Sequence, residues 1–434
     1  MIKPLSLLAL LGTLPAAAQT PGPPAASEPF AWGDFTWMNG NDRQKSALLD
    51  TPYFTGSALL DLNYTYDFAH PIDDTIVGST VAFRHNEFNL VMASVGGDFH
   101  YQNVRATLTL QLGERPVVLT HQDGSLARGQ YDLADAFRYL REANAGYHWN
   151  VLHGLNLDVG IFMSYIGLSY LNFENWAYQP PWVSDSTPYY FQGARVQIFP
   201  TDRLKVELWL INGWQSYAKF NQAPSVGVQL LYRPAEALSL TANAYAGFDT
   251  PDAATRLRIH SDTTGQWRYW NHPGRLLDRA AFSFTFDLGC EDGAGVRCAG
   301  NTPAAPQQNA IGAALFNRLW FAKDLLAFTA GLGAMSNPGR YLIFQPLGQG
   351  AELFPIAPAT SFNAWDASAT VDYLPSEYLT WRLEFIHRAA DVPYFAGPGG
   401  VTSPDGYTST STAGFTPDLR RFENRVSLAL LFRM

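Results

Sequence analysis

The feature that most constrains this chain is an alternation of apolar and polar residues that recurs along its length. It is clearest at the carboxyl end, where every second residue of 421–434 except Asn424 is apolar: Phe422, Val426, Leu428, Leu430, Phe432 and Met434. Charged residues such as Glu423 and Arg425 occupy the opposite positions. Because successive side chains of a β-strand point to opposite faces, this period of two predicts strands with one apolar and one polar face.

Apolar residues are abundant but dispersed. Hydrophobic residues make up 47% of the chain and aromatic residues 14%. Beyond the amino terminus, no segment approaches the ~20 consecutive apolar residues that a membrane helix needs. A period of two fits both a soluble sandwich, whose apolar faces meet in a core, and a membrane barrel, whose apolar face contacts lipid. The connections between the strands decide between these two folds.

The alternation predicts strands near residues 57–68, 86–95, 99–113, 142–150, 156–166, 189–199, 204–212, 225–233, 238–248, 279–288, 310–322, 325–335, 362–374, 378–388 and 420–434. Short polar turns, such as 323–324 and 374–377, alternate with long connections, such as 336–361 and 389–419. This order fails only after 238–248, unless one more strand passes through 255–270. We therefore predict an all-β fold, a transmembrane antiparallel β-barrel of about 16 strands (range 12–18) with short periplasmic turns and long extracellular loops.

The amino terminus has the layout of a secretory signal peptide. Lys3 supplies a positive charge, and the apolar run that follows it is too short to span a bilayer. Ala16-Ala17-Ala18 fits the A-x-A cleavage rule, so we expect cleavage before Gln19 in preference to a buried first strand. The predicted organisation is a signal peptide at 1–18, a periplasmic tail and lead-in at 19–56, and a barrel at 57–434, placed in the outer membrane.

Charge and cysteine content exclude several functions. Charged residues make up 15% of the chain and the net charge is −9, so an acidic surface without a basic stripe disfavours nucleic acid as a partner. In an exported protein, Cys290 and Cys298 are expected to form a disulfide, with two free thiols as the alternative. Glu291 and Asp292 beside them are too few ligands for a metal site. We expect no metal and no cofactor.

A barrel of this width has a lumen that wall side chains cannot fill, so it holds water or must be plugged. Charges on the polar faces should point into that lumen, because a charge at the lipid midplane costs about 2–4 kcal/mol. The inward charges expected to line the pore are Arg105, Lys205, Glu207, Arg382, Glu384 and Arg425. Their mixed signs argue against a strong ion preference, and the net negative charge favours cations weakly.

The connection 114–141 contains the best candidate for a constriction. Leu133, Phe137 and Leu140 recur at helical spacing, which predicts a short amphipathic helix within 131–142. The polar residues expected to line the narrowest section are Asp132, Asp135, Arg138 and Arg141. A solvated surface loop is the alternative interpretation of the same residues.

Aromatic residues and the barrel exterior suggest further contacts. The aromatic residues expected near strand ends, in an interfacial girdle, are Tyr178, Trp182, Tyr189 and Tyr190, with stacking platforms for sugars as the alternative. The expected partners are outer-membrane lipid, small hydrophilic solutes or ions, and the barrel-insertion machinery. A homo-oligomer is a further expected partner that the sequence does not test, because an interface on the barrel exterior is as apolar as the lipid-facing surface.

Several segments of the central third resemble the OmpL-like family of β-barrel porins. The segments that carry the resemblance are Tyr139-Leu140-Arg141-Glu142-Ala143, Gly160-Ile161-Phe162 with Ile166-Gly167, Tyr189-Tyr190-Phe191-Gln192-Gly193-Ala194-Arg195, and Asn212-Gly213-Trp214 before Asn221 and Pro224-Ser225. The resemblance implies an outer-membrane barrel through which small hydrophilic solutes diffuse, and it brings no catalytic residues. This chain ends in Met434 where such barrels usually end in an aromatic residue, with Phe432 two places earlier.

Two other functions compete with a porin. A barrel enzyme would carry a hydrolytic site at its extracellular rim, but the chain has no G-x-S-x-G elbow and no H-E-x-x-H helix. An adhesin or structural anchor would bind partners through its long loops and keep its lumen closed. The number of strands distinguishes a porin from a barrel enzyme, since barrel enzymes are usually narrower. Pore conductance distinguishes a porin from an anchor with a closed lumen.

Overall fold

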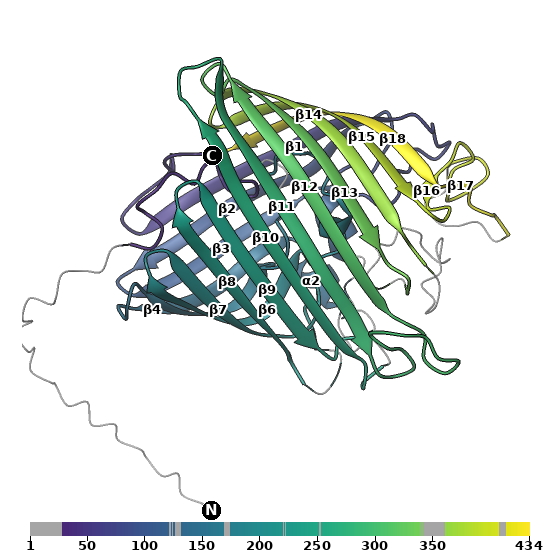
Figure 1. The fold of residues 1–434 in the computed structure, drawn as a ribbon, viewed down its shortest axis with the longest axis horizontal. Coiled ribbons are helices and arrows are strands. Elements are labelled where there is room, and N and C mark those ends of the chain that lie inside the picture. The colour runs from purple at the N-terminus through teal and green to yellow at the C-terminus, as the bar shows by residue number, and fades with distance from the viewer. Residues whose placement is uncertain are drawn as a thin grey trace, which may run out of the picture.

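Sixteen antiparallel strands form one closed barrel in the computed structural model (Figure 1). The structure describes residues 28–120, 123, 125, 132–168, 174–219, 221, 223–250, 253–339, 341, 361–407 and 414–434. The predicted signal peptide, residues 1–18, lies outside the described residues. The predicted fold class is confirmed: the first strand pairs with the last, so the sheet has no free edge.

The barrel strands are β1 (Phe54–Asp67), β2 (Phe88–Tyr101), β3 (Val104–Leu112), β4 (Leu140–Trp149), β5 (Leu155–Met163), β6 (Tyr190–Thr201), β7 (Leu204–Ile211), β8 (Ser225–Ala235), β9 (Leu238–Gly247), β10 (Leu257–Asn271), β11 (Leu277–Asp292), β12 (Asn309–Phe321), β13 (Leu326–Ser336), β14 (Ala364–Ser376), β15 (Leu379–Ala390) and β18 (Phe422–Arg433). The connections contain the helices α1 (Glu114–Thr120), α2 (Leu133–Phe137) and α3 (Trp182–Asp185), and the short strands β16 (Phe395–Ala396) and β17 (Leu419–Arg420).

Two details of the strand prediction are decided by the structure. The additional strand expected through 255–270 is present as β10, which pairs with β9 and β11. The strand expected at 99–113 is wrong in its bounds, because a tight turn at Gln102 and Asn103 separates β2 from β3. Gln102 takes a left-handed backbone conformation with φ 54°, and the turn has no glycine that would have marked it in the sequence.

Short turns and long connections alternate around the barrel, as predicted. Turns of a few residues join β6 to β7 and β14 to β15, whereas long connections join β1 to β2 and β5 to β6. The carboxyl terminus lies at the end of the barrel that carries the short turns, where Met434 and Ala58 exchange backbone hydrogen bonds. In outer-membrane barrels this end faces the periplasm.

Strand β13 shows how the alternation is used. Leu326, Phe328 and Leu332 are exposed on the outer face, while Ala327 and Thr329 are buried on the inner face. The outer face is thus a belt of apolar side chains suited to lipid. None of the helices in the described part of the chain has the length and apolar character to cross a membrane.

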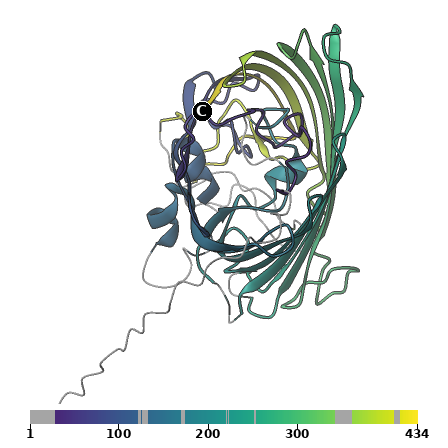
Figure 2. The ribbon, with the colours of Figure 1, turned by 90° about the vertical axis from the view of Figure 1, so that its left-hand side faces the viewer.

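Long connections and the amino-terminal residues enter the barrel. Figure 2 looks into the ring of strands and shows several coil segments crossing inside it. Large side chains in these segments, including Trp37, Tyr178 and Trp182, are almost completely buried. The core of this protein therefore lies within the lumen.

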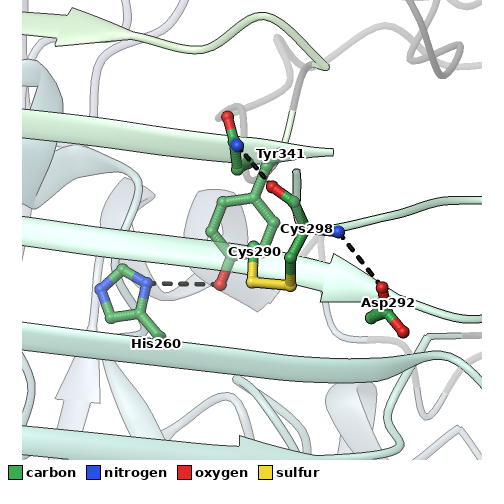
Figure 3. The surroundings of a disulfide bond; sticks show 6 residues. His260, Cys290, Asp292, Cys298 and Tyr341 are labelled. Atoms are coloured by element: carbon green, nitrogen blue, oxygen red, sulfur yellow. Dashed lines mark hydrogen bonds between the residues drawn. A yellow bond between two sulfur atoms is a disulfide. The ribbon is translucent and has the colours of Figure 1, made fainter. Parts of the chain in front are cut away.

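A disulfide closes the start of one long connection (Figure 3). Cys290, near the end of β11, is bonded to Cys298, and their Cα atoms are 5.0 Å apart. The Asn309 side-chain amide donates to the Cys298 carbonyl at 2.6 Å, and the Asp292 carboxylate accepts from the Cys298 amide at 3.3 Å. These contacts hold the loop close to the ends of β11 and β12.

The lipid-facing belt leads to a depth-dependent prediction. Leu332, near the middle of β13, is 61% exposed on the outer face. Leu332→Arg should lower the free energy of unfolding by about 2–4 kcal/mol, and Leu326→Arg at the strand end by about 0–1 kcal/mol. Urea titration of the barrel in lipid vesicles measures both. Leu332→Ala is the control for lost side-chain volume, and equal costs for the two arginines would contradict a lipid-facing belt at this position.

Candidate functional site

The inner wall of β12, β14, β15 and β18 carries charged residues arranged in pairs. Asp372 accepts hydrogen bonds from Arg382 Nε and from Arg318 Nη2, both at 2.7 Å. On β18, Arg425 Nη2 lies 3.2 Å from the Glu423 carboxylate. All five side chains are at most 5% exposed. Buried charges of this kind are tolerated because each has an oppositely charged partner.

The connection between β5 and β6 is described at residues 164–168 and 174–189. These residues fold into the lumen and are here called the inward loop. The Glu384 carboxylate on β15 accepts the backbone N–H groups of Tyr178 and Gln179 at 2.5 and 2.8 Å. Asp366 on β14 accepts the N–H of Trp182 at 2.8 Å. Because β14 and β15 lie across the ring from β5 and β6, the inward loop reaches the opposite wall.

Short helix α3 fixes the end of the inward loop. Its Asp185 carboxylate accepts hydrogen bonds from Arg388 at 2.9 Å and from the Thr80 hydroxyl at 2.7 Å. The Arg388 guanidinium also lies 3.7 Å from the ring centroid of Trp182 and donates to the Gly78 carbonyl at 2.6 Å. Burial raises the pKa of Asp185, while the charge of Arg388 opposes that rise. This cluster also binds the connection between β1 and β2 to the inward loop.

The amino-terminal residues 28–45, here called the lead-in segment, cross the periplasmic end of the lumen. Asn39 exchanges hydrogen bonds with the Gln266 side chain on the wall, at 2.7 and 3.1 Å. Its own side-chain oxygen accepts the N–H of Trp176 from the inward loop at 2.8 Å. The Trp176 indole donates to the Trp37 carbonyl at 3.2 Å. The lead-in segment is thus part of the lumen structure, joined to the inward loop.

Two cavities flank the lead-in segment. One, of about 780 Å³, lies between the lead-in segment, the inward loop and the wall that bears Arg318 and Arg382. The other, of about 860 Å³, lies against β2 to β5, where Arg105, His148 and Asp98 line it. Charged and polar side chains line both cavities, together with apolar ones, and both cavities lie toward the end with the short turns, so they are suited to hold water.

The predicted pore-lining charges all point inward, but their surroundings differ. Arg105 lies 3.1 Å from the Asp158 carboxylate, and Lys205 lies 2.6 Å from Glu207. The other three belong to the buried network that holds the inward loop: Arg382, Glu384 and Arg425. Sequence reasoning found the inward faces, and only the structure shows which of these charges pair within the wall and which also anchor the inward loop.

The predicted helix of the connection 114–141 exists as α2, but it lies against the wall. Its residues join an apolar cluster with Ile161 and Tyr190. Ile161 occupies an outer-face position of β5, since Leu157 and Val159 on the same face are exposed. The segment found across the lumen is therefore the inward loop, and the expectation that α2 forms the constriction stays a prediction without support from this packing.

The four predicted constriction residues have separate places. Asp132 caps α2 by accepting the N–H of Asp135 at 2.7 Å, and both residues are exposed. Arg138 is paired with Asp135. Arg141, at the start of β4, is buried and lies within the electrostatic field of Glu142 and of Glu174 on the inward loop. Of the four, Arg141 has the closest relation to the inward loop.

The interpretation of four aromatic residues as an interfacial girdle is wrong for three of them. Tyr178, Trp182 and Tyr189 belong to the inward loop and are at most 4% exposed. The Tyr178 hydroxyl donates to Asp61 on β1 at 2.9 Å, inside the barrel. Their position in the sequence just before β6 resembled a strand end, and no local pattern distinguishes an inward loop from an interfacial one.

A rim hydrolase finds little support in the described residues. Ser186, His260 and Asp287 line one cavity, of about 20 Å³. His260 Nε2 lies 3.2 Å from Asp287 and Nδ1 lies 3.3 Å from the Tyr341 hydroxyl, as Figure 3 shows for Tyr341. Both ring nitrogens are thus engaged away from Ser186, and the cavity has space for about one water molecule.

Glu174 gives the inward loop a predicted pH response. Burial raises its pKa from 4.5 to about 7, although it forms an ion pair with Arg433. The folded protein therefore holds this proton more tightly than the unfolded chain, and the resulting stabilisation is lost as the pH rises from 4.5 through 7. Relative to Glu174→Gln, the wild type should lose unfolding free energy between pH 5 and pH 8 in urea titrations. A relative gain over this range would show that the ion pair outweighs burial.

Comparisons with known proteins agree with this architecture. The family model described as putative beta-barrel porin-2, OmpL-like, matches residues 53–416. The outer membrane channel DcaP of Acinetobacter baumannii is similar with a TM-score of 0.51 and 10% identity, covering 90% of this chain and 100% of that one. The anion-selective porin from Comamonas acidovorans has a TM-score of 0.49 and 8% identity, covering 88% and 99%.

The likeness to DcaP shows the fold alone, because the identity is low. Comparison with curated proteins gives no match. The family model is the stronger finding, since it spans far more than half of the chain and nearly the whole barrel. The chain belongs to the OmpL-like family of β-barrel porins.

Proposed function

We propose that this porin lets small hydrophilic solutes diffuse across the outer membrane through water in its lumen. The observation that carries the proposal is a closed barrel of sixteen strands whose inner wall is charged and whose periplasmic half contains two cavities lined in part by charged side chains. The matching family model describes a porin, so the proposed role is transport rather than an enzymatic reaction.

The inward loop sets the width of the proposed passage. It reaches β14 and β15 through Glu384 and Asp366, and it therefore divides the lumen instead of lining one wall. The passage runs beside β2 to β6, where Arg105 and Arg195 both approach the Asp158 carboxylate.

Delivery and partners belong to the same proposal. Residues 1–18 act as a cleaved signal peptide, and the barrel-insertion machinery recognises β18 although the residue that follows it, Met434, is not aromatic. The outer belt of leucine, phenylalanine and alanine contacts outer-membrane lipid. Neither a metal nor a cofactor has a role in this function.

Single-channel recording of the purified mature protein tests the proposal. The refolded barrel is inserted into a planar bilayer under a salt gradient, and stable open steps with a measurable reversal potential are expected. A folded barrel that inserts and never conducts would remove the diffusion function and favour a loop-borne anchor.

Releasing the inward loop should widen the passage. Glu384→Ala removes the acceptor of two backbone N–H groups and is expected to raise the single-channel conductance and its fluctuations. Asp366→Ala removes an independent anchor, the acceptor of the Trp182 N–H, and should act in the same direction.

The matched control is Glu207→Ala, another buried inward carboxylate whose hydrogen bonds go to wall residues. This variant should change the conductance less than either anchor variant. Unchanged conductance in folded Glu384→Ala and Asp366→Ala barrels would show that the inward loop does not form the constriction.

A further inference from the structure

A row of hydrogen-bonded side chains crosses four neighbouring strands on the inner wall. His148 on β4 lies directly opposite Asn156 on β5. Gln197 on β6 lies opposite both Asn156 and Glu207, which belongs to β7. The three side-chain contacts along the row, in this order, are 2.7, 3.1 and 2.7 Å long. These four residues are here called the polar ladder.

Glu207 fixes the direction of each hydrogen bond in the polar ladder. Its carboxylate lies 2.6 Å from the ammonium group of Lys205, and an ionised carboxylate can only accept. Gln197 must therefore turn its NH2 group toward Glu207 and its carbonyl oxygen toward Asn156. Asn156 donates to that oxygen and presents its own carbonyl oxygen to Nδ1 of His148. Nδ1 of His148 consequently carries a proton.

The other ring nitrogen of His148 is the one that can gain or lose a proton. Its Nε2 atom lies 2.9 Å from the side-chain oxygen of Asn150, in the turn after β4. In this geometry both ring nitrogens face carbonyl oxygens, which matches an imidazolium that donates twice. When Nε2 loses its proton, the Asn150 amide has to turn its NH2 group toward the ring. Histidine is the side chain whose charge ordinarily changes between pH 5 and 8.

His148 and Asn150 both line the cavity of about 860 Å³ beside β2 to β5. The other charged or titratable side chains in this lining are Glu28, Asp98, His100, Arg105 and His153. Behind Arg105 lies Asp158, which Arg105 shares with Arg195. With or without Asp158 and Arg195, the carboxylates in this described group outnumber the guanidinium groups by one. The local charge is thus negative while the imidazoles are neutral, and it becomes positive when two of them are protonated.

We propose that His148 is a proton-dependent selectivity residue of the passage. Uptake of a proton at Nε2 adds a positive charge beside the cavity and shifts the ion preference toward anions, and release of the proton shifts it toward cations. Asn156 and Gln197 are positioning residues, because they hold one proton on Nδ1 and leave Nε2 for the exchange. The proposal rests on the proposed function, since it assigns the ion preference of the same passage.

The protonation state of His148 can be measured without a functioning pore. The refolded barrel is labelled with 15N in its nine histidines and studied by NMR in lipid at pH 8 and pH 5, and the His148→Gln variant identifies the signals of His148. At pH 8 the ring should carry its proton on Nδ1, whereas neutral histidine in water favours Nε2. At pH 5 both ring nitrogens should be protonated.

Gln197→Leu tests whether the polar ladder sets this state. The change frees Asn156 to turn its NH2 group toward Nδ1 without removing a contact of His148 itself, so at pH 8 the proton should move to Nε2. The matched control is Gln229→Leu, because Gln229 is another inward glutamine and its NH2 group donates to Tyr165 and Asn243, outside the polar ladder. This variant should keep the proton on Nδ1.

Reversal potentials under a potassium chloride gradient measure the effect on selectivity. His148→Gln should lower the anion-to-cation permeability ratio about twofold at pH 5, the order expected for one charge a few ångströms from a passing ion, and leave it unchanged at pH 8. His387→Gln removes a histidine from the outer face of β15 and should match the wild type at both pH values. The remaining groups that line the cavity are present in every variant, so their titration cancels in the comparison.

The outcomes separate the two proposals. A proton on Nε2 at pH 8, equal effects of Gln197→Leu and Gln229→Leu, or the same permeability ratio for wild type and His148→Gln at pH 5 would overturn the role of His148. A folded barrel that never conducts but keeps the proton on Nδ1 would remove the diffusion function and leave the proton site standing. Conduction with a permeability ratio that does not depend on His148 would do the reverse.

Discussion

The structure depends on one constraint, which is that every backbone N–H and C=O group within the hydrocarbon of a membrane must find a partner in the protein. A sheet meets this constraint only when its edges are joined, and here β1 and β18 are paired from Leu59 to Asp67. Because the outer face of the closed barrel contacts lipid, the strands carry apolar side chains there, as Leu332 and Phe328 show on β13. The even number of strands brings both ends of the barrel chain to the side of the short turns.

Closure with sixteen strands creates a second problem, because the lumen is too wide for wall side chains to fill. This chain fills part of it with its own segments and holds them by charge. Buried Arg388 is paired with Asp185 of the inward loop, and Glu384 accepts backbone N–H groups of the same loop. Each of these wall charges would be costly without its partner. The inward charges therefore anchor segments as well as face water, and the two cavities beside the lead-in segment are open spaces among the described residues of the lumen.

Much of the fold could be predicted from local sequence, and much of the site could not. The alternation predicted the inward direction of Glu384 and Arg425, and the order of short and long connections predicted β10. The helix α2 was also predicted, but its location was not, because amphipathic spacing does not say which surface the apolar side meets. Tyr178 contacts Glu384 across more than 200 positions of the chain, and no pattern of neighbouring residues contains that contact.

The sequence by itself determined the class of this protein, since period-two alternation, sparse charge and the spacing of turns are local properties that permit only a closed membrane barrel. The tertiary structure decided what occupies the lumen: the inward loop, the lead-in segment, and the pairing of Arg318 and Arg382 with one carboxylate. The reason is that side-chain direction follows from backbone periodicity, whereas the pairing of buried charges depends on which distant segments meet inside the barrel.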